Sequence, residues 1–195
     1  SGMRFLLRSA GRRVDENGGP MKWAAFLILA VITLIGQTTI AQVIAIHSIR
    51  PNWMLVLAVH YALWGPWPEA AIGAWFLGLA VDLASLPVGG RMVYAFSFGA
   101  AAWIIIRIRT VFWREHALTQ LLITFVFALA IELLVDVYRH WGGLAAISRS
   151  SLLWPAVFTA LYTAAFAPYM HWVLLRLWRW TGLKPSVKVK IRREY

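Results

Sequence analysis

Three carboxylates lie inside long apolar stretches of the sequence, and they are the side chains best placed to do chemistry or to bind a partner. They are Asp82, Glu132 and Asp136. A carboxylate at the centre of a lipid bilayer costs about 2.5 to 3.5 kcal/mol, so each of these acids marks a candidate functional site. Glu132 and Asp136 are four residues apart and therefore share one face of a helix.

Other catalytic signatures are missing from the sequence. The five His follow no metal-ligand spacing, and we expect most of them to lie at membrane interfaces. There is no GxSxG elbow, Walker loop or dinucleotide fingerprint. Zero Cys excludes a disulfide framework, a thiolate metal site and a cysteine nucleophile. We therefore predict no catalytic residue, no cofactor and no metal, and interpret the chain as a non-enzyme.

The elements that must position the three acids are membrane helices. The chain has 195 residues, of which 61% are hydrophobic and only 14% charged, whereas roughly 25% of residues are charged in soluble domains. Its net charge of +11 comes from cations between and beyond the apolar runs, an arrangement that disfavours nucleic-acid binding. Six segments approach the length that a bilayer requires, and they lack the alternation of a membrane barrel; they are residues 23–46, 53–64, 68–86, 92–111, 117–138 and 151–178. The sequence predicts an all-α, polytopic bundle of six transmembrane helices.

The cations predict the orientation of this bundle. We divide the chain into an N-terminal arm (1–20), a transmembrane domain (21–180) and a basic tail (181–195). Six crossings place 15 of the 19 Lys and Arg on the side of both termini and 4 on the other side. The positive-inside rule then predicts cytoplasmic termini. Arg107 and Arg109 are expected to reach the cytoplasmic headgroups, and Trp near segment ends, including Trp53 and Trp64, are expected to anchor at the interfaces.

The same topology places the three acids in the outer half of the bundle, on the side that also carries Arg50, Arg91, Arg139 and Arg149. Two interpretations follow: an internal ion-pair network, or a ligand pocket or partner-binding surface. Arg50, Pro51, Asn52 and Trp53 begin the short second segment. The candidate polar cluster therefore comprises Arg50, Asn52, Trp53, Asp82, Arg91, Glu132 and Asp136. Small residues around Gly73 and Gly78 indicate close helix packing.

The order of these features resembles the MreD family of rod shape-determining membrane proteins. The resemblance rests on Arg50-Pro51-Asn52-Trp53 at the start of a short helix, on Gly73 and Gly78 leading to Asp82-Leu83, and on a Gly-containing turn with Arg91. It continues through Leu133 to Asp136 and a Pro-containing last helix, and covers most of residues 21–180. It implies a six-helix fold similar to the S-components of energy-coupling-factor vitamin transporters.

The resemblance also implies a function. It indicates a non-enzymatic inner-membrane component of the bacterial cell-elongation machinery. Such a protein would bind MreC and help link the MreB filament to RodA and a class B penicillin-binding protein. Two alternatives remain open from the residues: a vitamin-type substrate-binding subunit with an outward pocket near Asp82, and an intramembrane hydrolase using Asp82 and Asp136 as a dyad.

Overall fold

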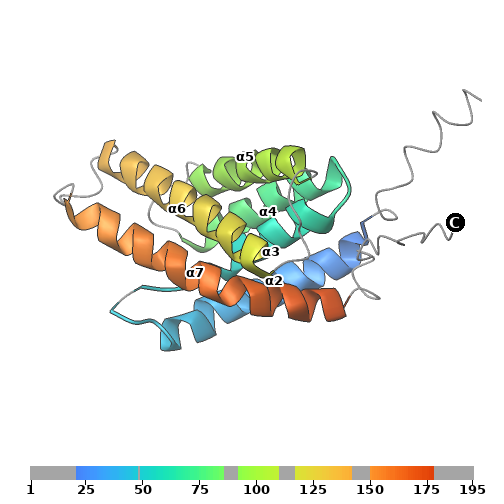
Figure 1. The fold of residues 1–195 in the computed structure, drawn as a ribbon, viewed down its shortest axis with the longest axis horizontal. Coiled ribbons are helices and arrows are strands. Elements are labelled where there is room, and N and C mark those ends of the chain that lie inside the picture. The colour runs from blue at the N-terminus through green and yellow to red at the C-terminus, as the bar shows by residue number, and fades with distance from the viewer. Residues whose placement is uncertain (1–20, 48, 86–91, 110–116, 142–149, 178–195) are drawn as a thin grey trace, which may run out of the picture.

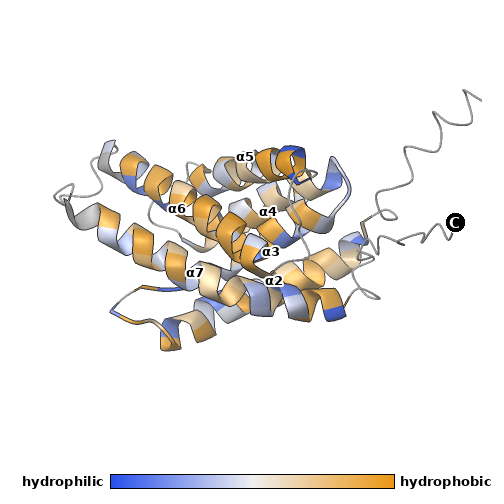
Figure 2. Ribbon diagram, viewed as in Figure 1, coloured by the Kyte–Doolittle hydropathy of each residue, from blue (hydrophilic) through white to orange (hydrophobic). Residues whose placement is uncertain are grey.

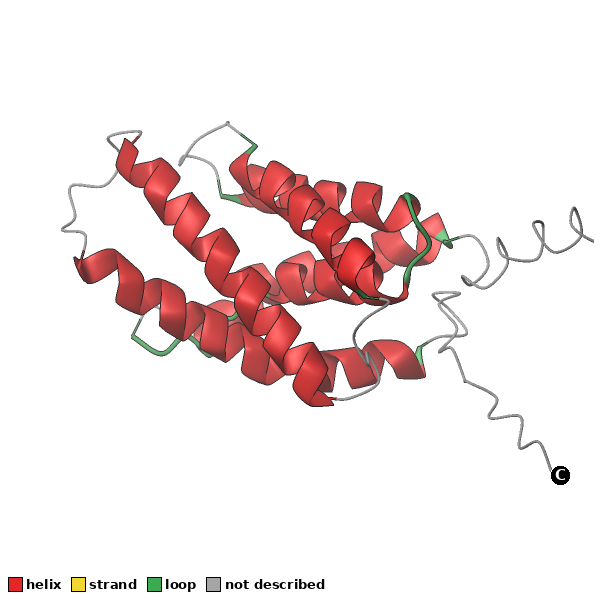
Figure 3. Ribbon diagram, turned by 45° about the horizontal axis from the view of Figure 1, so that its top comes forward, coloured by secondary structure: helices red, strands yellow, loops and turns green. Residues whose placement is uncertain are grey.

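A computed structural model of the chain describes residues 21–47, 49–85, 92–109, 117–141 and 150–177. Within these ranges the chain forms six α-helices: α2 (Trp23–Val43), α3 (Trp53–Trp64), α4 (Glu69–Ala84), α5 (Val93–Ile108), α6 (Ala117–Trp141) and α7 (Ser150–Arg176). Figure 3 shows helices joined by loops, and the described residues contain no strand beyond one isolated bridge between Ile46 and Ile49. The all-α class is confirmed, and each helix begins within one residue of its predicted start.

Helix α3 lies at the centre of the bundle. Every residue from Met54 to Trp64 is buried, and the helix contacts each of the other five. Its 12 residues rise about 18 Å at 1.5 Å per residue, well short of the roughly 30 Å of a bilayer core. A helix that is apolar on all sides is one surrounded by protein. The short second segment is therefore the core element around which the others pack.

The outer helices pack in neighbouring pairs, α4 against α5 and α6 against α7 (Figure 1). Small residues permit the first of these contacts, as the sequence predicted. A Cβ added at Gly78 would lie 2.7 Å from the Cα of Ala95 on α5. Gly73 instead faces α2, where an added Cβ would lie 3.2 Å from the ring of Phe26. Helix α2 contacts α3 and α4 but none of the other described helices.

Successive helices run in opposite directions. Trp23 at the start of α2 and Arg176 at the end of α7 consequently lie at the same end of the bundle (Figure 1). At that end the backbone N–H of Met21 donates a hydrogen bond of 2.7 Å to the Glu69 carboxylate, which joins the starts of α2 and α4. The C-terminal ends of α2, α4 and α6 lie with the N-terminal ends of α3, α5 and α7 at the opposite end.

Large apolar side chains are exposed on the outside of the bundle, and hydrophobic residues, drawn in orange, predominate along the helices in Figure 2. Ile32 on α2, Leu118 on α6 and Trp172 on α7 are each more than half exposed. Helices α2 and α6 are long and apolar enough to cross a membrane by length and composition, whereas the apolar helices α3 and α5 are shorter. The chain thus has helices suited to a membrane, and the number of crossings remains a prediction.

Candidate polar site at one end of the bundle

Asn52 fixes the start of the central helix. Its side-chain oxygen accepts a hydrogen bond of 3.1 Å from the backbone N–H of Leu55, which is the usual geometry of an Asn N-cap. Gln37 of α2 accepts the N–H of Met54 at 2.9 Å. The backbone N–H of Asn52 in turn donates to the hydroxyl of Thr163 on α7 at 2.9 Å. The predicted helix start is confirmed, and three helices meet at it.

Asp82 fixes the start of a different helix. Its two carboxylate oxygens accept the backbone N–H groups of Tyr94 (3.2 Å) and Ala95 (2.9 Å). These belong to the first turn of α5, whose own preceding residue, Met92, has φ of 52° and provides no side-chain cap. A carboxylate is also favoured at a helix N-terminus by the helix dipole. Asp82 therefore acts as a cap supplied by a neighbouring helix, and its hydrogen-bond partners among the described residues are backbone N–H groups.

Arg109 fixes the other end of α3, which corrects the expectation that it reaches the headgroups. Only 6% of the residue is exposed. Its guanidinium donates to the carbonyl oxygens of Ala62 (3.0 Å) and Gly65 (2.6 Å). The last carbonyls of a helix need partners outside the helix, and a cation there is favoured by the dipole. Arg107 is exposed, and its guanidinium lies 5.2 Å from the centre of the Trp103 ring; its reach to the headgroups stays a prediction.

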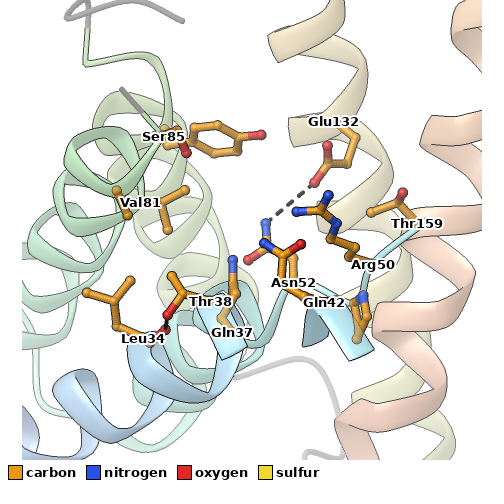
Figure 4. Close-up of a pocket in the computed structure, with 13 residues that line it drawn as sticks. Leu34, Gln37, Thr38, Gln42, Arg50, Asn52, Val81, Ser85, Glu132 and Thr159 are labelled. Atoms are coloured by element: carbon orange, nitrogen blue, oxygen red, sulfur yellow. Dashed lines mark hydrogen bonds between the residues drawn. The ribbon is translucent and has the colours of Figure 1, made fainter. Parts of the chain in front are cut away.

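A polar pocket of about 400 Å³ opens beside the start of α3. Arg50, Asn52 and Glu132 line it together with residues from α2, α4, α5 and α7 (Figure 4). Asn52 donates from Nδ2 to the Glu132 carboxylate at 3.4 Å. Arg50 points into the same pocket from the α2–α3 connection (Figure 4). Opposite charges thus face one polar space between helices that are far apart in the sequence.

Trp53 is half-buried and packs between helices. One edge of its ring would lie 2.8 Å from a Cβ added at Gly36 of α2, and its ring centre is 6.2 Å from that of Phe166 on α7. Trp64 at the other end of α3 is buried. These two residues therefore differ from the expected interfacial anchors, because the central position of α3 places both ends of the helix inside the bundle.

The structure brings together only part of the predicted cluster. Arg50, Asn52 and Glu132 share the pocket, and Asp82 lies on the adjacent α4 with its oxygens turned to α5. Asp136 is half-buried one turn after Glu132 on α6. Arg91 lies outside the described residues, as do the side chains of Arg139 and Arg149. The predicted network of acids with these three Arg therefore stays a prediction.

Sequence reasoning missed a pair of histidines in the core. His60 of α3 and His171 of α7 are both fully buried, and their Nδ1 atoms are 2.9 Å apart. The expectation that most His are interfacial is wrong for these two. Neither Nε2 atom has a hydrogen-bond partner in the described part of the chain. No local pattern connects two His that are 111 positions apart, so only the packing of α3 against α7 could identify the pair.

Comparison with known families matches residues 20–180 to the family described as rod shape-determining protein MreD. No match was found among curated proteins or among solved structures. The expected similarity to transporter S-components therefore stays a prediction. The matched range contains all six helices and the three helix-capping residues Asn52, Asp82 and Arg109. The chain belongs to the MreD family of rod shape-determining membrane proteins.

Proposed function

We propose that the chain is a non-catalytic, multi-pass scaffold in the bacterial inner membrane that binds MreC within the rod-shape complex. Through MreC it would connect the MreB filament to RodA and a class B penicillin-binding protein. The family match over residues 20–180 carries this proposal.

The use of the polar side chains supports a structural role. A catalytic carboxylate or cation has to reach a substrate. Both oxygens of Asp82 accept backbone N–H groups, the Arg109 guanidinium donates to backbone carbonyls, and Asn52 caps its own helix. These residues hold helix ends in fixed positions, which favours a rigid platform over a reaction centre.

The outer surface supports an interaction with other membrane helices. Exposed apolar residues cover α2, α6 and α7, where a partner helix would replace lipid. The small residues Gly73 and Gly78 are occupied inside the bundle by Phe26 and Tyr94. We therefore propose that MreC contacts one of the outer apolar faces rather than Gly73 and Gly78 of α4, which already face α2 and α5.

Purification together with MreC tests the scaffold. We expect the chain and MreC to co-purify in mild detergent. A photo-reactive residue at Ile32 on α2, Val126 on α6 or Leu161 on α7 should crosslink to MreC from one of these exposed faces. The same residue at Ile123, which lies on the buried face of α6, should not crosslink. Loss of co-purification together with unchanged cell shape after depletion would refute the proposal.

Orientation has a separate test. The chain contains no Cys, so single Cys residues can be introduced and labelled without background. With both termini in the cytoplasm, Ser186→Cys in the tail should label only after the cells are opened. His47→Cys, which is exposed between α2 and α3, should label from outside intact cells. The reverse pattern would overturn the topology.

A further inference from the structure

A furrow follows the seam between α2 and α4 through both halves of the bundle. Close contacts join the two helices near their starts, where Gly73 faces Phe26 and the Met21 N–H donates to the Glu69 carboxylate. Further along, two hollows lie between the helices: an apolar groove of about 380 Å³ and the polar pocket of about 400 Å³. Leu34 lines both hollows, so they are continuous, and we call them together the α2–α4 furrow.

One side of α2 forms a wall of this furrow. Its furrow-lining residues recur every three or four positions, which places them on one face of the helix. They include Leu27, Val31 and Leu34 at the groove and Leu34, Thr38 and Gln42 at the pocket. From Trp23 to Gln42 the furrow follows nineteen residue steps, or about 28 Å at 1.5 Å per residue. This length is close to the roughly 30 Å of a bilayer core.

The length and the two halves of the furrow favour a helix over a lipid as its occupant. In the topology proposed above, the apolar groove lies in the cytoplasmic half of the membrane and the polar pocket in the outer half. An acyl chain belongs to one leaflet and covers about 15 Å, half of the bilayer core. A transmembrane helix crosses both halves, so its side chains can enter the groove and the pocket in turn. Helix α2 contacts α3 and α4 but none of the other described helices, which gives such a helix lateral access.

Arg50 places a positive charge inside the outer half of the furrow. The α2–α3 connection returns into the bundle before α3 begins, because the Met54 N–H donates to Gln37 of α2. Gln37 lies six residues before the end of α2, or about 9 Å below it. Arg50 shares the pocket with Gln37, Thr38 and Gln42 (Figure 4). A cation at this depth in a membrane bundle is expected to pair with an opposite charge.

The carboxylates of the described outer half are already engaged within the chain. Asp82 accepts two N–H groups of α5. Glu132 accepts a hydrogen bond from Asn52 and has a further partner, and Asp136 also has a partner. Arg50, in contrast, is exposed and has no hydrogen bond or ion pair. A second copy of the chain would present the same engaged acids, so the charge that matches Arg50 has to come from a different protein.

We propose that the α2–α4 furrow binds one transmembrane helix of another membrane protein, which is apolar in its inner half and carries an Asp or Glu in its outer half that pairs with Arg50. A guanidinium and a carboxylate form two parallel hydrogen bonds. Gln37 adds a donor at the same pocket, because its oxygen is used by the Met54 N–H and its amide nitrogen remains. The inference rests on the proposed function, since it assigns the MreC helix to this furrow.

Photo-crosslinking of the full chain, co-expressed with MreC, locates the bound helix. A photo-reactive residue at Leu27, Val31 or Phe76 should crosslink to MreC, because these side chains line the furrow and are about half exposed. Val126 on α6 and Leu161 on α7 are the matched controls. They are exposed to a similar degree but do not line the furrow, and the same residue at either position should give no crosslink.

Charge variants test the polar end of the furrow. Arg50→Gln should weaken MreC binding about tenfold or more, the size expected for losing a charged hydrogen bond. Its melting temperature should equal that of the parent, because Arg50 has no bonded partner and the variant adds no charge beside Glu132. Arg50→Glu should abolish binding, and Arg in place of the outer Asp or Glu of the MreC helix should restore it. Arg107→Gln removes an exposed cation outside the furrow and should change nothing.

A size variant tests the apolar end. Ala80→Phe fills the groove and should weaken MreC binding, whereas Ala100→Phe at an exposed position of α5 should not. Both variants are compared at equal melting temperature.

The outcomes separate this inference from the proposed function. Co-purification of MreC with crosslinks from Val126 or Leu161, and none from the furrow, would reject the furrow and keep the scaffold. Absence of MreC from the purified parent chain would refute both. Crosslinks from Leu27 or Val31 to a second copy of the chain, or to lipid alone, would replace the partner helix as occupant. Full MreC binding by Arg50→Gln and Arg50→Glu would remove the charge pair.

Discussion

Gly78 and Asp82 lie one turn apart on α4, and both meet the first turn of α5. Gly78 lets the backbone of Tyr94 and Ala95 approach, and Asp82 accepts the N–H groups of the same two residues. The close approach brings the N–H groups within reach of the carboxylate. Together these residues explain how α5 begins without a cap of its own.

Removal of the Asp82 carboxylate should destabilise the bundle. Asp82→Ala loses both hydrogen bonds to α5 and should cost about 1 kcal/mol, which lowers the melting temperature by about 2 to 4 °C for a chain of this size. Asp82→Asn keeps one acceptor oxygen, so its melting temperature should lie between those of Asp82→Ala and the parent chain. Thermal unfolding in detergent measures the series. A higher melting temperature for Asp82→Ala would mean that the cost of placing the charge in the membrane exceeds the value of the cap.

A single methyl group at Gly78 should disturb the α4–α5 contact. Gly78→Ala would place a Cβ against the Tyr94 carbonyl and 2.7 Å from the Cα of Ala95, and overpacking of this kind costs about 1 to 3 kcal/mol. Gly99→Ala on α5 is the control, because its Cβ would lie 3.5 Å from the nearest atom of Trp75, an ordinary contact. Denaturant titration should show a loss of stability for the first variant alone. Equal stability of the two variants would contradict the close approach of α4 and α5.

Arg109 should matter more than Arg107, although both lie near the end of α5. Arg109→Ala would leave the carbonyls of Ala62 and Gly65 without their donor, at about 1 to 3 kcal/mol for an unsatisfied buried group. Arg107→Ala, at an exposed position, should change stability by no more than about 0.5 kcal/mol. The folded fraction of each variant after mild heating provides the comparison. Similar losses for both would show that Arg109 does not cap α3.

The buried histidines should behave as a coupled pair. His60→Leu or His171→Leu alone leaves the partner's Nδ1 without its hydrogen bond and should destabilise the bundle by about 1 to 3 kcal/mol. The double variant replaces both polar groups, so it should lower the free energy of unfolding by less than the sum of the two single losses. A double-mutant cycle of unfolding free energies measures the coupling, which we expect to be at least about 0.5 kcal/mol. Simple additivity would mean that the two rings do not interact.

The sequence alone was sufficient to locate the starts of the described helices. Apolar runs bounded by Pro, Gly and charged residues placed each helix start within one residue, because run length and breaking residues act locally. The start at Arg50 to Trp53 was predicted in this way, and the structure adds that Asn52 caps it by accepting the N–H of Leu55. The small residues at Gly73 and Gly78 likewise indicated close packing, which the structure confirms.

The tertiary structure decided which groups meet. Asp82 and the N–H groups of α5 belong to different helices, Arg109 reaches the end of α3 across more than 40 residues, and His60 meets His171 across 111. Each contact depends on how helices are oriented and which faces touch, and a pattern along one helix does not specify its neighbours. A buried polar group must find a partner wherever the packing supplies one. For that reason the sequence identified the costly polar residues of this bundle, while the arrangement of α3 among its neighbours determined what they bind.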